Sequence, residues 1–104
     1  MKLNVYSIYD SAAGAYTRPF YTQADAQALR MFTDIALEAD NDIGKHPEDY
    51  SLVRCGVWND QDAQFTPEAV ETLATANEVI AASRKVSKPA LESFEADING
   101  DTVQ

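Results

Sequence analysis

The N-terminal part of the chain has the residue pattern of a β-hairpin. Residues 3–9 are rich in β-branched and aromatic side chains, and their alternation predicts a strand. Residues 10–14 predict a turn, and residues 15–21 predict a second strand. Because Pro19 has no N–H to donate, this second strand is expected at a sheet edge or with a bulge. We expect the two strands to pair in antiparallel fashion.

The spacing of apolar residues after the hairpin predicts a first helix. Thr22 is a suitable N-cap, and the helix should continue to about residue 38 or 39. Its buried stripe would consist of Ala28, Leu29, Phe32, Ile35, Ala36 and Ala39. Residues 40–44 carry the stop signals Asn and Gly, and residues 45–50 form a polar connector.

The second half of the chain is predicted to hold one or two strands and a long helix. Residues 51–58 have the composition of a strand, and residues 63–65 could add a short fourth strand. Thr66 is a good N-cap and Pro67 a good first helical residue, so a second helix should run to about residue 85. Its inner stripe would consist of Ala69, Leu73, Ala76 and Ile80.

These elements predict an α+β fold. We expect an antiparallel sheet of three or four strands with two helices on one face, in the order β-β-α-β-(β)-α. Residues 1–86 would form this single domain, and residues 87–104 an acidic tail that is mobile or ordered by a partner. The expected core consists of Leu3 or Ile8, with Val5, Leu29, Phe32, Ile35, Leu52, Val53, Val57, Leu73 and Ile80.

The charge of the chain restricts its partners. The 104 residues include 8 Lys and Arg against 17 Asp and Glu, a net charge of −9. This balance opposes non-specific binding to nucleic acid and suits basic protein partners. The acid is concentrated away from the N-terminal segment, because residues 1–22 carry Lys2 and Arg18 against Asp10 alone. No apolar run approaches the roughly 20 residues of a transmembrane helix, and the start lacks a signal-peptide core, so we expect no membrane contact and a cytoplasmic protein.

Few residues could carry catalysis or hold a metal. With one Cys and one His, the chain predicts neither an internal disulfide nor a zinc site. Cys55 would lie on an apolar strand face, where a buried and inert thiol is the usual outcome. The acidic pairs in the loops, and residues 97–101, do not match a calcium-binding loop. We therefore predict a non-enzymatic protein with no catalytic residue, no metal and no cofactor.

The placement of the aromatic residues is more informative. Five of them fall within residues 1–22: Tyr6, Tyr9, Tyr16, Phe20 and Tyr21. A sheet face with aromatic rings beside a cation can stack single-stranded bases, at about 1–3 kcal/mol per base. Tyr6, Tyr16, Arg18 and Phe20 are therefore candidate nucleic-acid-binding residues. The alternative interpretation, core packing and cross-strand aromatic pairs, stays open.

Two stretches of the chain resemble a viral family. They are the opening Met1-Lys2-Leu3-Asn4-Val5-Tyr6-Ser7-Ile8-Tyr9-Asp10-Ser11 and the run Lys45-His46-Pro47-Glu48-Asp49-Tyr50-Ser51-Leu52. Both are similar to the small nonstructural protein of gokushoviruses, single-stranded DNA phages of the microvirus group. The resemblance covers about residues 1–67, and the C-terminal third departs from the family with an Ala-rich helix and an acidic tail.

The resemblance implies a protein made in the cytoplasm of an infected bacterium. It would act in the synthesis or packaging of single-stranded viral DNA, through the DNA itself or through a viral replication or packaging protein. The charge favours an alternative, a homo-oligomeric acidic adaptor that binds a host or viral protein.

Overall fold

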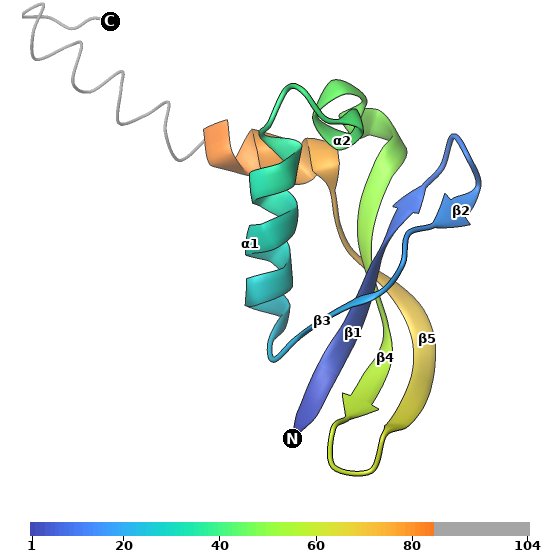
Figure 1. The fold of residues 1–104 in the computed structure, drawn as a ribbon. Coiled ribbons are helices and arrows are strands. Elements are labelled where there is room, and N and C mark those ends of the chain that lie inside the picture. Colours follow the sequence, from blue (N-terminus) through green and yellow to red (C-terminus); the bar gives the residue numbers. More distant parts are fainter. Residues whose placement is uncertain (85–104) are drawn as a thin grey trace, which may run out of the picture.

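In the computed structural model, which describes residues 1–84, the strands form one antiparallel sheet with the helices on one side (Figure 1). In chain order the elements are β1 (Lys2–Asp10), β2 (Ala15–Tyr16), β3 (Phe20–Thr22), α1 (Asp25–Ala36), α2 (Asp42–Lys45), the 3-10 helix η1 (Pro47–Asp49), β4 (Tyr50–Asn59), β5 (Gln64–Thr75) and a helix over residues 76–84. The strand order is β2-β1-β4-β5, with β3 also on β1. The predicted α+β fold and its order are confirmed, and the predicted tail, residues 87–104, lies outside the described residues.

The predicted hairpin forms, but its second strand is divided in two. β2 pairs with the end of β1 and β3 with its first half. Between them, Thr17 replaces the regular ladder: its backbone N–H donates to the Ile8 carbonyl at 2.9 Å, and its hydroxyl accepts from the Ile8 N–H at 3.0 Å. Pro19 follows, where a missing N–H costs the sheet nothing. The sheet therefore has one strand more than expected.

α1 begins two residues later than predicted, because Thr22 is not its N-cap. Thr22 is buried, and its hydroxyl donates to the Ala24 carbonyl at 2.8 Å. The side chain of Gln27 satisfies the free start of the helix instead. Its Oε1 accepts from the backbone N–H groups of Gln23 at 3.0 Å and Ala24 at 3.2 Å. The helix ends at Ala36 rather than at residue 38 or 39.

The prediction of a helix from Thr66 is wrong over residues 66–75. These residues continue β5, which pairs with β4 at the edge of the sheet, where Pro67 is tolerated. β4 gains a hydrogen-bonded partner on both sides of two register shifts this way, which outweighs the helical preference of a short Ala-containing segment. The last helix begins after Thr75, which forms a capping box. The Glu78 N–H donates to the Thr75 hydroxyl at 3.1 Å, and the Thr75 N–H donates to the Glu78 carboxylate at 2.8 Å.

The core lies between the sheet and the helices. Tyr6, Ile8, Leu52 and Ala74 of the sheet pack against Ala28, Phe32 and Ala36 of α1 and Ala76 and Val79 of the last helix. Of the predicted core residues, Val5, Ile8, Phe32, Leu52 and Val53 are buried, whereas Leu3, Leu29, Ile35, Val57, Leu73 and Ile80 are partly exposed. Tyr6, a candidate base-binding residue for which core packing was the alternative, is part of this core. Among residues 1–84, no helix has the length and hydropathy needed to cross a membrane.

Candidate functional site

One face of the sheet is left without helices. Directly opposed residues of an antiparallel pair share a face, so the register of β1 identifies this side. We define the open face by the residues on the side of the sheet away from α1: Leu3, Val5, Ser7 and Tyr9 of β1, Tyr16 of β2, Tyr21 of β3, Val53, Gly56 and Trp58 of β4, and Phe65 of β5. Val5, Ser7 and Val53 of this face are themselves buried.

The open face carries two groups of aromatic rings. At one end Tyr9 and Tyr16 lie with ring centroids 4.7 Å apart, and at the other Tyr21 meets Trp58 edge to face at 6.2 Å. Phe65 stands opposite Trp58, and its ring covers Gly56, where any Cβ would lie 2.6 Å from it. Tyr16, Tyr21 and Phe65 are each about half exposed, at 54%, 46% and 47%. Leu3 lies opposite Trp58, and Tyr9 is six residues further along β1. At about 3.3 Å per strand residue, the two groups are about 20 Å apart.

An apolar hollow of about 240 Å³ lies between the two aromatic groups. Its lining consists of Ser7, Tyr16, Thr17, Pro19, Val53, Cys55 and Val70. Cys55 sits at a bulge, where the register with β1 shifts, and its thiol donates to the Val5 carbonyl at 3.6 Å. Burial raises the pKa of the Cys55 thiol, so the thiol is protonated at neutral pH.

Charged residues avoid the open face within residues 1–84. Every charged residue that has a register partner on β1, β4 or β5 lies on the helix side: Lys2, Asp10, Arg54 and Glu71. Arg18 is exposed in the loop between β2 and β3. A chain with a net charge of −9 thus presents one broad surface that is aromatic and uncharged.

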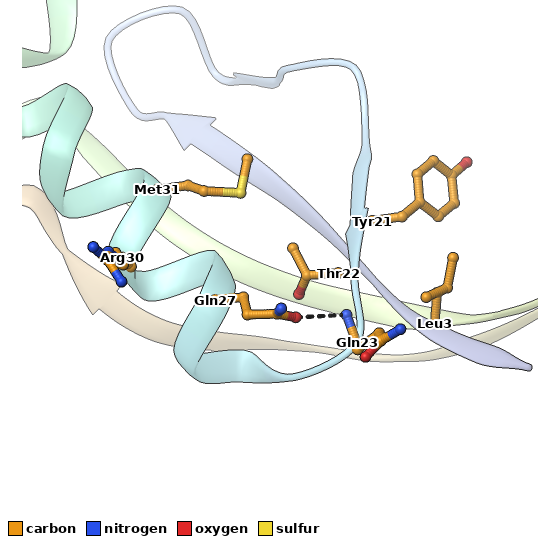
Figure 2. Close-up of a pocket in the computed structure, with 7 residues that line it drawn as sticks. All are labelled: Leu3, Tyr21, Thr22, Gln23, Gln27, Arg30 and Met31. Atoms are coloured by element: carbon orange, nitrogen blue, oxygen red, sulfur yellow. Dashed lines mark hydrogen bonds between the residues drawn. The ribbon is translucent and has the colours of Figure 1, made fainter.

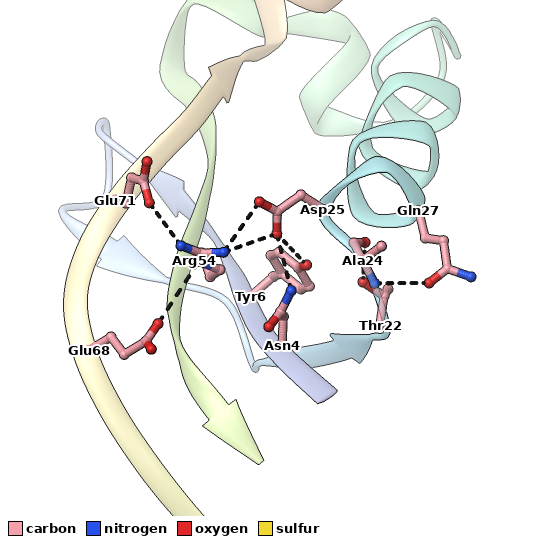
Figure 3. A network of polar contacts seen from close by, with 9 residues as sticks. All are labelled: Asn4, Tyr6, Thr22, Ala24, Asp25, Gln27, Arg54, Glu68 and Glu71. Atoms are coloured by element: carbon pink, nitrogen blue, oxygen red, sulfur yellow. Dashed lines mark hydrogen bonds and ion pairs between the residues drawn. The ribbon is translucent and has the colours of Figure 1, made fainter. Parts of the chain in front are cut away.

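The helix side carries a polar network centred on Arg54 (Figure 3). Arg54 lies 3.3 Å from Asp25 at the start of α1, 3.2 Å from Glu71 and 4.0 Å from Glu68 of β5. The Tyr6 hydroxyl donates to Asp25 at 2.7 Å, and burial raises the pKa of Tyr6. This network joins α1 to β1, β4 and β5, and we assign it a structural role. Residues 1–84 hold no group of three or more His, Cys, Asp or Glu side chains placed to share a metal ion.

The four predicted site residues do not form one surface. Tyr6 has no exposed area, and its ring stacks on the partly buried Phe20 at 5.6 Å on the helix side, so these two rings lie away from Tyr16. Tyr16 does lie on the open face, and Arg18 lies in the adjoining loop. In a continuous strand Tyr16 and Phe20 would share a face, but the segment from Thr17 to Pro19 leaves the ladder and inverts the alternation.

Sequence reasoning missed most of the open face. Tyr21, Trp58 and Phe65 were not among the candidates, because they come from three strands that only the fold brings together. The pairing of Trp58 with Phe65 belongs to β5, for which the sequence predicts only a possible short strand over residues 63–65, followed by a helix from Thr66. The sequence does contain one indication of the open face. The alternation of residues 3–9 places Leu3 and Tyr9 on the same face of β1, which is the open face.

A family model with the description Phage ORF5 protein matches residues 3–79, which extend from the second residue of β1 through β5 into the last helix. Neither the curated proteins nor the solved structures give a match.

Proposed function

The chain belongs to the Phage ORF5 protein family, and from this premise we propose that it is a nonstructural, non-enzymatic accessory protein that binds single-stranded viral DNA on its open face. Its work would be in the synthesis or packaging of that DNA, in the cytoplasm of an infected bacterium. The support for this role is the resemblance of residues 1–11 and 45–52 to the nonstructural protein of gokushoviruses.

The observation that carries the DNA proposal is an exposed aromatic surface without carboxylates. Tyr16, Tyr21 and Phe65 offer half-exposed rings, and each ring that stacks on a base contributes about 1–3 kcal/mol with little dependence on sequence. The acidic groups on the helix side are screened over about 8–10 Å at physiological salt, so they weaken binding less than a net charge of −9 suggests.

The same surface favours single strands over duplex DNA. Stacking requires bases that are free on at least one side, which a duplex does not offer. Because few cations border the open face, we expect a shallow dependence of affinity on salt. Each phosphate contact contributes a slope of about −0.7 in a plot of log K against log salt for single strands. A total slope between 0 and about −2 would distinguish this stacking mode from the steeper slope of a basic protein.

A fluorescence anisotropy titration tests the proposal directly. The probe is a labelled oligo(dT), and the variants are Tyr16→Ala and Phe65→Ala, both at half-exposed positions of the open face. The matched control is Leu37→Ala, which removes an apolar side chain 51% exposed at the end of α1. Each open-face variant should weaken binding about 5- to 150-fold, and the control should not. No binding by the wild-type protein, or equal losses in all three variants, would refute the proposal.

A second candidate function is the homo-oligomeric adaptor, and the apolar hollow favours it. A base placed there would leave the polar atoms on its edge without hydrogen-bond partners, whereas an apolar side chain of a protein partner would lose nothing. The partner would be a second copy of the chain, a host protein or a viral replication or packaging protein. Light scattering of the wild-type protein and of Val70→Asp tests the first of these. Oligomers that dissociate in the variant would support the adaptor, and a monomeric wild-type protein would exclude the homo-oligomer.

A further inference from the structure

We infer that a single strand bound on the open face continues across the edge of β3 into a second subsite, where Arg30 binds a backbone phosphate. The inference rests on the proposed function and extends it to an adjoining groove. The group bound in this groove is a phosphodiester rather than a base. The groove has a volume of about 570 Å³ and lies between β3 and α1 (Figure 2).

The groove is continuous with the open face. Leu3 and Tyr21 belong to both, because they stand on the open face and also line one side of the groove. The opposite side is formed by Gln27, Arg30 and Met31 of α1. β3 is an outer strand of the sheet, so a chain that leaves Tyr21 can pass around the strand without crossing another element (Figure 1).

The polar groups of the groove are suited to a phosphate. Arg30 is the one charged residue of the lining, and within residues 1–84 no carboxylate lies within ion-pair distance of its guanidinium. A guanidinium offers paired N–H donors that match two phosphate oxygens. The Oε1 of Gln27 is already bound to the N–H groups of Gln23 and Ala24, so the amide NH₂ of Gln27 is the end left to donate (Figure 2).

The apolar part of the groove is suited to the base of the same nucleotide. Met31 of α1 is 46% exposed and gives a base an apolar surface to lie against, while the equally exposed Tyr21 ring points away from α1 on the open-face side of β3 (Figure 2). In a chain with a net charge of −9, a groove lined by one cation and no anion also places no carboxylate of its own against a phosphate.

A salt series with two charge-matched variants tests the inference. Arg30→Gln removes the cation of the groove, and the control Lys45→Gln removes a cation at the end of α2, outside the groove. Dissociation constants for a 20-nucleotide oligo(dT) are measured between 50 and about 300 mM salt. Arg30→Gln should reduce the magnitude of the log–log salt slope by about 0.7, while Lys45→Gln leaves the slope unchanged. Arg30→Lys should restore the slope, which separates the charge from any effect of the substitution on the helix.

The length of the oligonucleotide gives a second readout. A four-nucleotide oligo(dT) can be held by the open face alone, so Arg30→Gln should not change its affinity. An unchanged salt slope in Arg30→Gln, or an equal change in Lys45→Gln, would overturn the inference while the proposed function stands. If the wild-type protein binds neither oligonucleotide, the proposed function and the inference fail together.

Discussion

Removing the side chain of Tyr6 distinguishes a core residue from a surface for bases. Tyr6 has no exposed area, and its ring stacks on Phe20 at 5.6 Å between the sheet and α1. Truncation of a buried aromatic residue costs about 3–5 kcal/mol, so Tyr6→Ala should lose that much free energy of unfolding. Tyr16→Ala removes an exposed tyrosine whose partner is Tyr9, and it should cost only about 0.5–1.5 kcal/mol.

Tyr6→Phe isolates the hydroxyl from the ring. The hydroxyl donates to the carboxylate of Asp25 at 2.7 Å, and a hydrogen bond to a charged group contributes about 1.5–3 kcal/mol. Asp25 is 38% exposed and also contacts Arg54, so water and the guanidinium replace part of this bond in the variant. We therefore expect a loss of about 1–2 kcal/mol.

Urea denaturation monitored by circular dichroism gives these free energies. Thermal unfolding checks them, because 1 kcal/mol corresponds to about 4–8 °C for a domain of this size. The expected order of stability is wild type, Tyr6→Phe, then Tyr6→Ala, with Tyr16→Ala close to Tyr6→Phe or above it. If Tyr6→Ala were no less stable than Tyr16→Ala, Tyr6 would not lie in the core and the assignment of faces to β1 would be wrong.

Three further predictions concern stability. Gly56→Ala places a Cβ 2.6 Å from both the Phe65 ring and a backbone carbonyl, and it should cost about 1–3 kcal/mol in urea denaturation; wild-type stability would contradict this packing. Thr75→Ala should lower the free energy of unfolding by about 0.5–2 kcal/mol in the same assay, and Thr66→Ala by less than about 0.5 kcal/mol. A larger loss for Thr66→Ala than for Thr75→Ala would contradict the assignment of Thr75 as the N-cap of the last helix. Because the pKa of Tyr6 is raised in the folded protein, its contribution to stability is full below pH 10 and is lost as the pH rises further. The difference in urea midpoint between the wild type and Tyr6→Phe should therefore decrease above pH 10. A difference that stays constant would contradict the raised pKa.

The elements that local pattern could predict are those with regular alternation or spacing. β1, β4 and α1 each appear within a few residues of their expected bounds. The pattern predicts only the start of β5, over residues 63–65, because the register with β4 shifts at two places and removes the alternation that identifies a strand. The Thr66-Pro67 pair is a good helix start in isolation, and only the need of β4 for a partner keeps these residues extended. The capping box between Thr75 and Glu78 was present in the sequence, and it marks the true start of the last helix.

The candidate site was less predictable than the fold. Of the four candidate residues that the aromatic cluster near the N-terminus predicts, Tyr16 lies on the open face. The face on which each side chain lies depends on whether the strand from Ala15 to Tyr21 is continuous. Because the strand is interrupted after Tyr16, Tyr21 lies on the open face and Phe20 on the helix side. Long-range pairing added Trp58 and Phe65. A local pattern cannot supply either piece of information.

The emission of Trp58 tests the central claim most directly. It is the one tryptophan of the chain, and it lies on the open face against Tyr21. Titration with unlabelled oligo(dT) should quench this emission in a saturable way, with the same midpoint as the anisotropy titration, because a base that stacks on this cluster contacts the indole or its partner ring. An anisotropy signal that saturates while the emission of Trp58 stays constant would place the DNA elsewhere and contradict the assignment of the open face.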